Sequence, residues 1–394
     1  MGSLRLVLAF AVAGGHALGA FNFPNIFLAG GEAVQIFYMI SGFLIALILR
    51  GKYAASANGN WIFYSNRAVK IFVPYLALLA ATVLLSALFY LFTGNAVSLN
   101  SFVVEGSTMS LGTWLFAVLT NLFILGQEWA FLLIYRSGEL FFSLHALDQP
   151  QNAAQFTIIA PAWSLSIELA FYAIAPFILR RNVLVIAVVA LASSWLRFEA
   201  YGRGYYSAAT DCRFFPFELS LFLFGSLSYF LYELLKKRNL HRPALSTCLM
   251  GLLVVLAALH PRWVDIKPYQ FFVLVALLLP ALFDFSVRHK WDRWLGELSY
   301  PLYLVHWPIL GFGFAITQLP HMGSLGQTQA YPYMLIAVSL IAAYAINQWI
   351  VIPIDSWRQA RVRKSATEPN KVAIPAAAQP VVRRSAPRGV VTPN

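Results

Sequence analysis

Residues 4–18 of the chain read LRLVLAFAVAGGHAL, an apolar stretch that holds two ionisable side chains. Arg5 stands near its start, and His16 follows eleven residues later. With a helical rise of about 1.5 Å per residue, the two lie roughly 16 Å apart along the axis. That is about half of the hydrocarbon core of a bilayer, taken as about 30 Å. Ionisable groups inside a membrane are costly, so this spacing requires an explanation, which is catalytic chemistry, transport or packing alone.

The composition is that of a polytopic membrane protein. Of the 394 residues, 59% are hydrophobic and 11% are charged, whereas soluble domains carry about 25% charged residues. The net charge of +12 comes from Lys and Arg in short loops and near the C-terminus. This pattern favours positive-inside topology over a nucleic-acid-binding surface. The two cysteines, Cys212 and Cys248, suggest neither a disulfide framework nor a cysteine metal site.

Ten apolar runs are long enough to span a bilayer. They cover 4–22, 32–50, 71–93, 157–179, 183–200, 213–235, 243–260, 268–287, 297–318 and 331–353. If every basic cluster lies in the cytoplasm, an even number of crossings separates each cluster from the next. An eleventh run, 109–126, must then be a re-entrant or interfacial helix. We therefore predict an all-α, polytopic transmembrane helix bundle of about ten spanning helices plus this one, in a bacterial cytoplasmic (inner) membrane, with both termini cytoplasmic.

The chain divides into a transmembrane domain, 1–357, and a tail, 358–394. The tail turns to Ala, Pro, Arg and Ser without periodicity, which predicts a disordered basic cytoplasmic segment. Residues 1–5 are too short for the basic segment of a signal peptide, so we expect the first run to stay as a spanning helix.

Four ionisable positions stand out in the predicted spans: Glu218 just inside the sixth span, where the structural alternative is an interfacial charge, and three deeper ones, His16, Glu168 and His306. Each has a structural alternative, namely a core histidine bound to a neighbouring helix or a carboxylate paired with a basic group. Together they also fit the relay of a proton-coupled transporter or exporter. Transporters often show repeated halves, and we find no internal repeat in this sequence. Ser299, Tyr303 and His306 can share one helical face, although Pro301 and Pro308 disturb the ends of that helix.

Two further features indicate ligands. Arg67 and Lys70 stand three residues apart at the start of the third run, where they either anchor the topology or form a phosphate clamp. The loop 200–213 mixes tyrosines with charges and ends at Arg213, a composition that suits a sugar or a loop near lipid headgroups. No G-x-S-x-G elbow, P-loop, dinucleotide glycine fingerprint or H-E-x-x-H motif is present.

Taken in order, several motifs resemble the acyltransferase-3 family of integral-membrane acyltransferases. The Arg5–His16 spacing is similar to that family's basic residue, ten residues, histidine pattern. The further segments are FYMISGFL at 37–44, NRAVKIFVPY at 66–75, WSLSIE at 163–168 with Phe171, Tyr172 and Pro176, and the stretches 217–225 and 295–308. Lys70 replaces an arginine expected in the family, which keeps the charge but loses the bidentate fork. Asn66 replaces another basic residue.

The resemblance implies transfer of an acyl group, often acetyl, from acyl-CoA to a hydroxyl of a sugar or glycan. We expect His16 to act as general base, since an imidazole titrates near neutral pH, and Glu168 to orient it. Arg5, Arg67 and Lys70 are expected to bind the donor at the cytoplasmic face. The expected substrate-lining residues are Ser41, Trp163, Ser166, Ser299, Tyr300, Tyr303, His306 and Arg213. Acyl-CoA, preferably acetyl-CoA, is expected as co-substrate, with no permanently bound cofactor, no metal and no nucleic acid.

Overall fold

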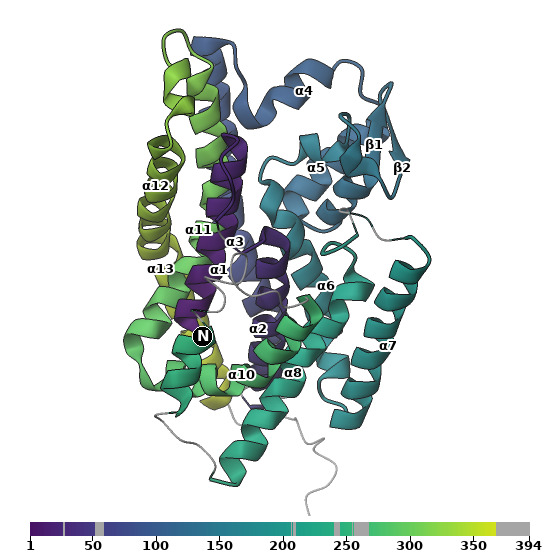
Figure 1. Cartoon of the computed structure of the whole chain (residues 1–394), viewed down its shortest axis with the longest axis vertical. Coiled ribbons are helices and arrows are strands. Elements are labelled where there is room, and N and C mark those ends of the chain that lie inside the picture. The colour runs from purple at the N-terminus through teal and green to yellow at the C-terminus, as the bar shows by residue number, and fades with distance from the viewer. Residues whose placement is uncertain are drawn as a thin grey trace, which may run out of the picture.

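The computed structural model describes residues 1–26, 28–51, 59–205, 207, 210–239, 245–253, 255 and 268–367. The described chain is a bundle of long helices, which confirms the all-α fold class (Figure 1). The long helices are α1 (Gly2–Ala20), α2 (Gly30–Arg50), α3 (Gly59–Thr93), α6 (Trp163–Ile178), α7 (Val183–Gly202), α8 (Phe215–Lys237), α10 (Pro268–Arg288), α11 (Lys290–Thr317), α12 (Ala330–Ile346) and α13 (Ile352–Thr367).

Within the described residues, eight helices are long and apolar enough to cross a membrane, and they coincide with eight of the ten predicted runs. A ninth run corresponds to α11, which has 28 residues but is less apolar because its first two turns carry Lys290, Asp292, Arg293 and Glu297. The tenth run, 243–260, lies partly outside the described residues. Pro301 and Pro308 lie inside α11, which stays continuous, so our expectation that they disturb its ends was wrong.

Helices α2 and α8 cross at two glycines. A methyl group on Gly42 would collide with the Phe222 carbonyl, and one on Gly225 would collide with the Met39 carbonyl. Small residues let membrane helices approach closely enough for backbone contact. This crossing fixes Ser41, the neighbour of Gly42, in the centre of the bundle.

Helix α1 packs along α11, and its N-terminus is capped by a residue of that helix. The carboxylate of Asp292 accepts hydrogen bonds from the backbone N–H groups of Gly2 and Ser3, each at 2.8 Å. A carboxylate at a helix N-terminus satisfies free N–H groups and complements the helix dipole. The cap sets the depth of α1 against α11, and therefore the depth of both Arg5 and His16.

Short elements between α3 and α6 form one end of the bundle. They are α4 (Asn100–Glu105), α5 (Leu111–Phe123) and an antiparallel hairpin of β1 (Leu133–Arg136) and β2 (Glu139–Phe142), joined by 3₁₀ turns. Helix α5 corresponds to the ambiguous eleventh run. Its 13 residues span about 20 Å, which is too short to cross a bilayer alone. The side chain of Asn121 ties it to the Phe156 carbonyl at 2.8 Å and to the Ile158 N–H at 2.9 Å.

At the other end of the chain, α12 continues through a π-helical turn, Asn347–Val351, into α13. The tail was predicted to begin at residue 358, and this boundary was wrong, because α13 continues to Thr367. Arg358 pairs with Asp355, and Arg361 donates to Ser65 of α3 at 3.2 Å, so local and tertiary contacts extend the helix. Residues 368–394 of the predicted tail lie outside the described residues.

Candidate active site

Two of the cavities among the described residues lie along α1, one toward its Arg5 end and one at its His16 end. The first has a volume of about 110 Å³ and is enclosed by α1, α2, α3, α6 and α11. The residues predicted to line a site that do line this cavity are Arg5, Ser41, Arg67, Lys70, Glu168, Ser299, Tyr300 and Tyr303. Residues from five separate helices thus meet in one place.

Three cations face this first cavity: Arg5, Arg67 and Lys70. In the described part of the chain, none of their charged groups has a hydrogen bond or an ion pair, although Arg67 lies over the Tyr172 ring at 5.7 Å. Arg5 and Lys70 also line a small neighbouring cavity of about 40 Å³ with Glu297. With Glu168 as the carboxylate on the first cavity, the three cations leave a net positive charge there. Since uncompensated charge in a low-dielectric interior is costly, this cluster is suited to bind an anion.

Glu168 faces the three cations and is held by two hydroxyl groups. Its Oε1 accepts a hydrogen bond from Ser41 Oγ at 2.5 Å and another from the Tyr172 hydroxyl. Ser164, Glu168 and Tyr172 follow one another at intervals of four along α6, so they share a face. Ser164 is hydrogen-bonded in turn to the Tyr303 hydroxyl at 2.7 Å.

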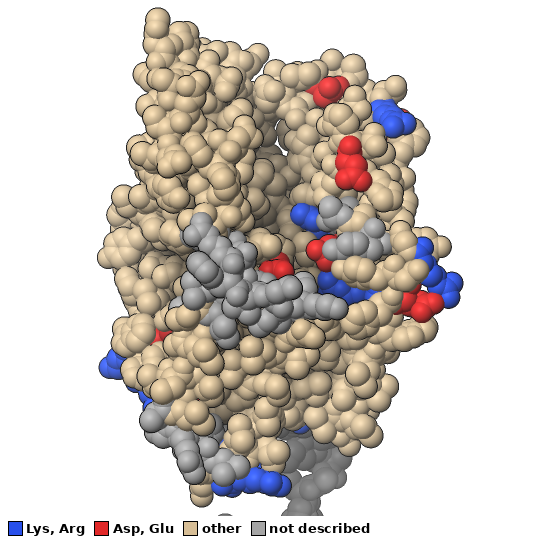
Figure 2. All heavy atoms as spheres, in the orientation of Figure 1, with Lys and Arg blue, Asp and Glu red and all other residues tan. Residues whose placement is uncertain are grey.

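The second cavity is larger, about 470 Å³, and lies between α1, α11 and the segments around α4 and residues 153–157. In Figure 2 the surface is hollowed between the column of α1, α11 and α12 and the α5 region. Its lining consists of neutral amide and hydroxyl side chains, one imidazole and aromatic rings. These residues are His16, Asn95, Ser98, Asn100, Ser101, Gln155, Thr157, Trp307 and Phe314, together with smaller apolar side chains.

His16 is exposed on the wall of this second cavity, and its partner is His306. The two rings are nearly coplanar, with an interplanar angle of 15° and centroids 5.3 Å apart, and they meet edge to edge, with Nδ1 of His16 3.0 Å from Nε2 of His306. His306 is 1% exposed, and its Nδ1 lies 3.1 Å from the Leu302 carbonyl oxygen. Our expectation that Glu168 orients His16 was therefore wrong, because the hydrogen bonds of Glu168 go to Ser41 and Tyr172 in the first cavity. A proton relay through His16, Glu168 and His306 is interrupted for the same reason, because Glu168 is hydrogen-bonded to neither histidine.

The wall between the two cavities is one turn of α11. Tyr303 lines the first cavity, and His306, three residues later, contacts the histidine that lines the second. Phe37 packs edge-on against Tyr303 with centroids 6.2 Å apart. Two chambers of different chemistry thus meet across a thin aromatic layer.

Four of the residues predicted to line the substrate lie on neither cavity: His306, which is buried behind His16, and Trp163, Ser166 and Arg213. The Arg213 guanidinium is 4.6 Å from the ring centroids of both Phe131 and Trp163, so Trp163 supports an arginine. Ser166 Oγ accepts a hydrogen bond from the Gly126 N–H at 2.9 Å and holds the turn after α5. Ser166 and Ser164 differ by two helical positions, about 200° of rotation, which explains why one faces the loop and the other the cavity.

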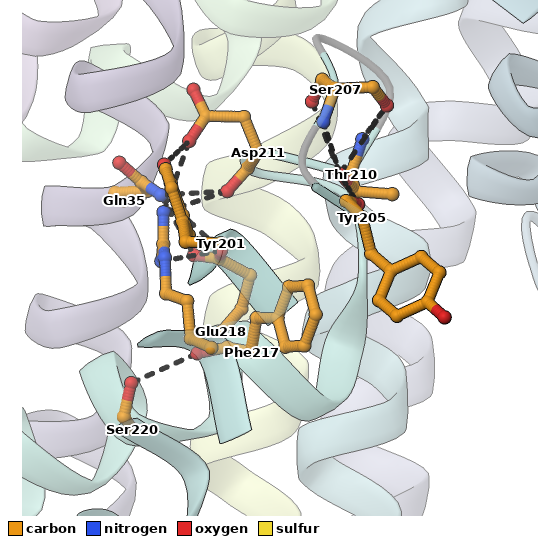
Figure 3. A network of polar contacts seen from close by, with 10 residues as sticks. Gln35, Tyr201, Tyr205, Ser207, Thr210, Asp211, Phe217, Glu218 and Ser220 are labelled. Atoms are coloured by element: carbon orange, nitrogen blue, oxygen red, sulfur yellow. Dashed lines mark hydrogen bonds and ion pairs between the residues drawn. The ribbon is translucent and has the colours of Figure 1, made fainter. Parts of the chain in front are cut away.

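A buried charged network holds the loop that carries Arg213. Arg197 of α7 donates to Glu218 Oε1 at 2.9 Å and to Asp211 Oδ1 at 3.1 Å. Gln35 donates to Glu218 at 3.2 Å and to the Asp211 carbonyl at 3.3 Å. Figure 3 shows Gln35, Asp211 and Glu218 pointing toward one another from α2, the loop and α8. The network joins these elements to α7 and fixes the residues next to Arg213.

Sequence reasoning missed several lining residues. Ser164 and Tyr172 were detectable from their spacing of four on either side of Glu168. The amides and hydroxyls of the second cavity come from irregular segments and carry no periodic signal. In the described residues, no group of three or more His, Cys, Asp and Glu side chains is placed to hold a metal ion.

Comparison with known proteins found no match among curated proteins and none among solved structures. A family model described as "Acyltransferase domain" matches residues 2–348, which is nearly the whole chain and includes both cavities and the wall between them. The protein is therefore an integral-membrane acyltransferase that belongs to the acyltransferase-3 family.

Proposed function

We propose that the protein transfers an acyl group, preferably acetyl, from acyl-CoA to a hydroxyl of a sugar or glycan. The observation that carries this proposal is the pair of cavities on either side of the Tyr303–His306 turn. One offers three cations that have no ion pair among the described residues, and the other offers an exposed imidazole among neutral polar groups.

The donor would bind at the first cavity. CoA carries phosphate groups, and Arg5, Arg67 and Lys70 offer charge-assisted hydrogen bonds to them. The cavity of about 110 Å³ holds on the order of four water molecules at about 30 Å³ each. That space suits the phosphate groups beside the cations and the start of the arm, with the rest of the nucleotide outside the bundle. The arm would displace the Tyr303 ring to bring the thioester to His16. The Arg5 end, with both termini, would lie in the cytoplasm of a bacterial cell, where acyl-CoA is made.

The acceptor would bind in the second cavity. Its amide and hydroxyl side chains match the donors and acceptors of a sugar ring, and Trp307 offers an apolar face. No Lys, Arg, Asp or Glu lines this cavity among the described residues, which favours a neutral hydroxyl-rich acceptor.

In the transfer step, His16 takes the proton of the acceptor hydroxyl as its oxygen attacks the thioester carbonyl. The new C–O bond forms, the C–S bond breaks, and the protonated imidazole returns the proton to the leaving thiolate. A base held in place by a second group is the usual arrangement for such a step.

The first test measures transfer from labelled acetyl-CoA in membranes that contain the protein and an extracted glycan and lipid fraction. We expect His16→Ala to lower the rate by about 10²–10⁴-fold, the usual contribution of a general base. Transfer at the wild-type rate by well-folded His16→Ala protein would contradict this role.

The second test measures binding of CoA to purified protein. Removal of one charge-assisted contact, as in Lys70→Gln, should weaken CoA binding by about 10–100-fold, since such bonds contribute about 1.5–3 kcal/mol. Arg50→Gln is a matched control, because Arg50 already donates to the Leu179 and Arg181 carbonyls. Equal effects of the two substitutions would argue against a donor site at the three cations.

A further inference from the structure

The direction of the hydrogen bonds around His306 determines where its proton lies. A carbonyl oxygen only accepts hydrogen bonds, so the contact of 3.1 Å between His306 Nδ1 and the Leu302 carbonyl requires a proton on Nδ1. In a neutral imidazole, the other nitrogen is then an acceptor. His306 is buried, and the charged groups of the described chain form no ion pair with it, which favours the neutral ring.

The same logic extends to His16. Because His306 Nε2 accepts, the contact of 3.0 Å requires that His16 Nδ1 carries the proton and donates it. The Nε2 atom of His16 is then left without a proton. His16 is exposed on the wall of the second cavity, and its Nε2 has no hydrogen-bond partner among the described residues. A lone pair is therefore presented where the acceptor would bind.

We propose that His306 is a positioning residue that fixes the tautomer of His16, so that Nε2 of His16 is the atom that removes the acceptor's proton. The chain of donors runs from His16 Nδ1–H to His306 Nε2, and from His306 Nδ1–H to the Leu302 carbonyl. His306 thus performs the task that a carboxylate performs in a Ser-His-Asp triad, and a backbone carbonyl of the same helix holds His306. This inference rests on the proposed function.

The arrangement also serves the charged intermediate. When His16 Nε2 takes the proton, the ring becomes cationic and its Nδ1–H bond to His306 becomes charge-assisted, which strengthens it. The proton then leaves from the same Nε2 atom to the CoA sulfur. No proton passes through His306 in either direction, so its part is orientation.

A spectroscopic test needs no substrate. In ¹⁵N NMR, protonated and unprotonated imidazole nitrogens have well-separated shifts. The chain has seven histidines, so spectra of ring-labelled wild-type, His16→Gln and His306→Gln protein in nanodiscs at pH 8 assign the signals by difference. We expect a protonated Nδ1 and an unprotonated Nε2 on both rings. A protonated Nε2 on His16 would overturn the proposal.

A kinetic test uses the acetyl-CoA assay with two substitutions at residue 306. His306→Leu removes the acceptor, and we expect kcat to fall by about 10³–10⁴-fold, as loss of the correct tautomer does in a Ser-His-Asp triad, while the KM for acetyl-CoA changes by less than about threefold. His306→Gln keeps an acceptor oxygen near the same place and should restore activity to within about 100-fold of wild type. Wild-type activity of the leucine variant, or equal loss in both variants, would refute the proposal.

A matched control and the wild-type rate distinguish failure of the tautomer proposal from failure of the proposed function and from misfolding of a variant. His289 also contacts the carbonyl four residues earlier, with its Nδ1 2.9 Å from the Phe285 oxygen, but it lines neither cavity, so His289→Leu should leave kcat unchanged. If wild-type protein transfers no acetyl group, the proposed function fails, and the NMR result alone decides the tautomer. If the leucine variant does not fold, the glutamine variant and the wild-type spectrum decide it.

Discussion

The buried pair of Arg197 and Glu218 allows a quantitative test of the packing around α7 and α8. Glu218 is fully buried and the Arg197 side chain is 4% exposed, with 2.9 Å between Nη1 and Oε1. Arg197→Leu would leave the carboxylate with Gln35 as its remaining described partner. An uncompensated buried charge of this kind lowers the free energy of unfolding by about 3–5 kcal/mol. Since proteins are stable by only about 5–15 kcal/mol, the variant should be severely destabilised.

The decisive comparison is a double-mutant cycle. Replacing a buried ion pair by apolar residues of similar size is often neutral or stabilising, so Arg197→Leu combined with Glu218→Leu should recover most of the loss. Equilibrium unfolding in mixed detergent–SDS micelles, followed by tryptophan fluorescence, gives the four free energies. Two results would refute the reasoning: a single substitution that changes the free energy of unfolding by less than about 1 kcal/mol, or a double variant as unstable as the single one.

A second ion pair provides the control. Arg203 and Glu199 pair on the surface of the same helix end, with side chains 68% and 40% exposed. Exposed pairs contribute about 0–1 kcal/mol, so Arg203→Leu should change the free energy of unfolding little. Equal effects at the two sites would show that burial does not determine the result.

Three further predictions follow from the packing, the second cavity and the topology. Gly225→Ala should lower the free energy of unfolding by about 1–3 kcal/mol, because the added methyl group meets the Met39 carbonyl. Gly30→Ala is the control and should be neutral, because a methyl group there meets nothing within 4 Å. Equal effects of the two substitutions would contradict the close crossing of α2 and α8. Gln155→Leu should raise the KM for the acceptor by about 5–30-fold, because one or two hydrogen bonds of about 1 kcal/mol each are lost. The KM for acetyl-CoA should stay unchanged. A change in the KM for acetyl-CoA alone would contradict acceptor binding in the second cavity. In a cysteine-free background, an impermeant maleimide added to intact cells should label Ser107→Cys and not Gln359→Cys, and the reverse pattern would invert the proposed orientation.

The sequence was sufficient to predict which segments form spanning helices and at what level along its helix each candidate residue lies. Apolar runs gave the spans, and the eleven-residue interval correctly placed Arg5 and His16 at different levels of α1. Arg67 and Lys70, from a distant segment, do line the same cavity as Arg5. The roles of all these residues stay predictions.

What the sequence could not supply was the rotation of each helix relative to its neighbours. Glu168 and His306 both lie in spans that approach α1, and periodicity does not say which one turns toward His16. A carboxylate is the usual hydrogen-bond partner of a catalytic histidine, but the helix packing brings His306 rather than Glu168 next to His16. The position of Arg213 could not be predicted for another reason. It depends on the network of Arg197, Asp211 and Glu218, which joins elements far apart in the chain.

The thin wall between the cavities has an electrical consequence. If the two cavities open to opposite sides of an energised membrane, most of the membrane potential falls across the single turn from Tyr303 to His306. Moving one elementary charge through 100 mV takes about 2.3 kcal/mol, so a phosphate-bearing donor or a bare proton meets a field concentrated over a few ångströms. An acyl group is neutral and crosses without electrical work. On the proposed function, the layer that separates donor from acceptor would keep the membrane insulated while the neutral acyl group passes.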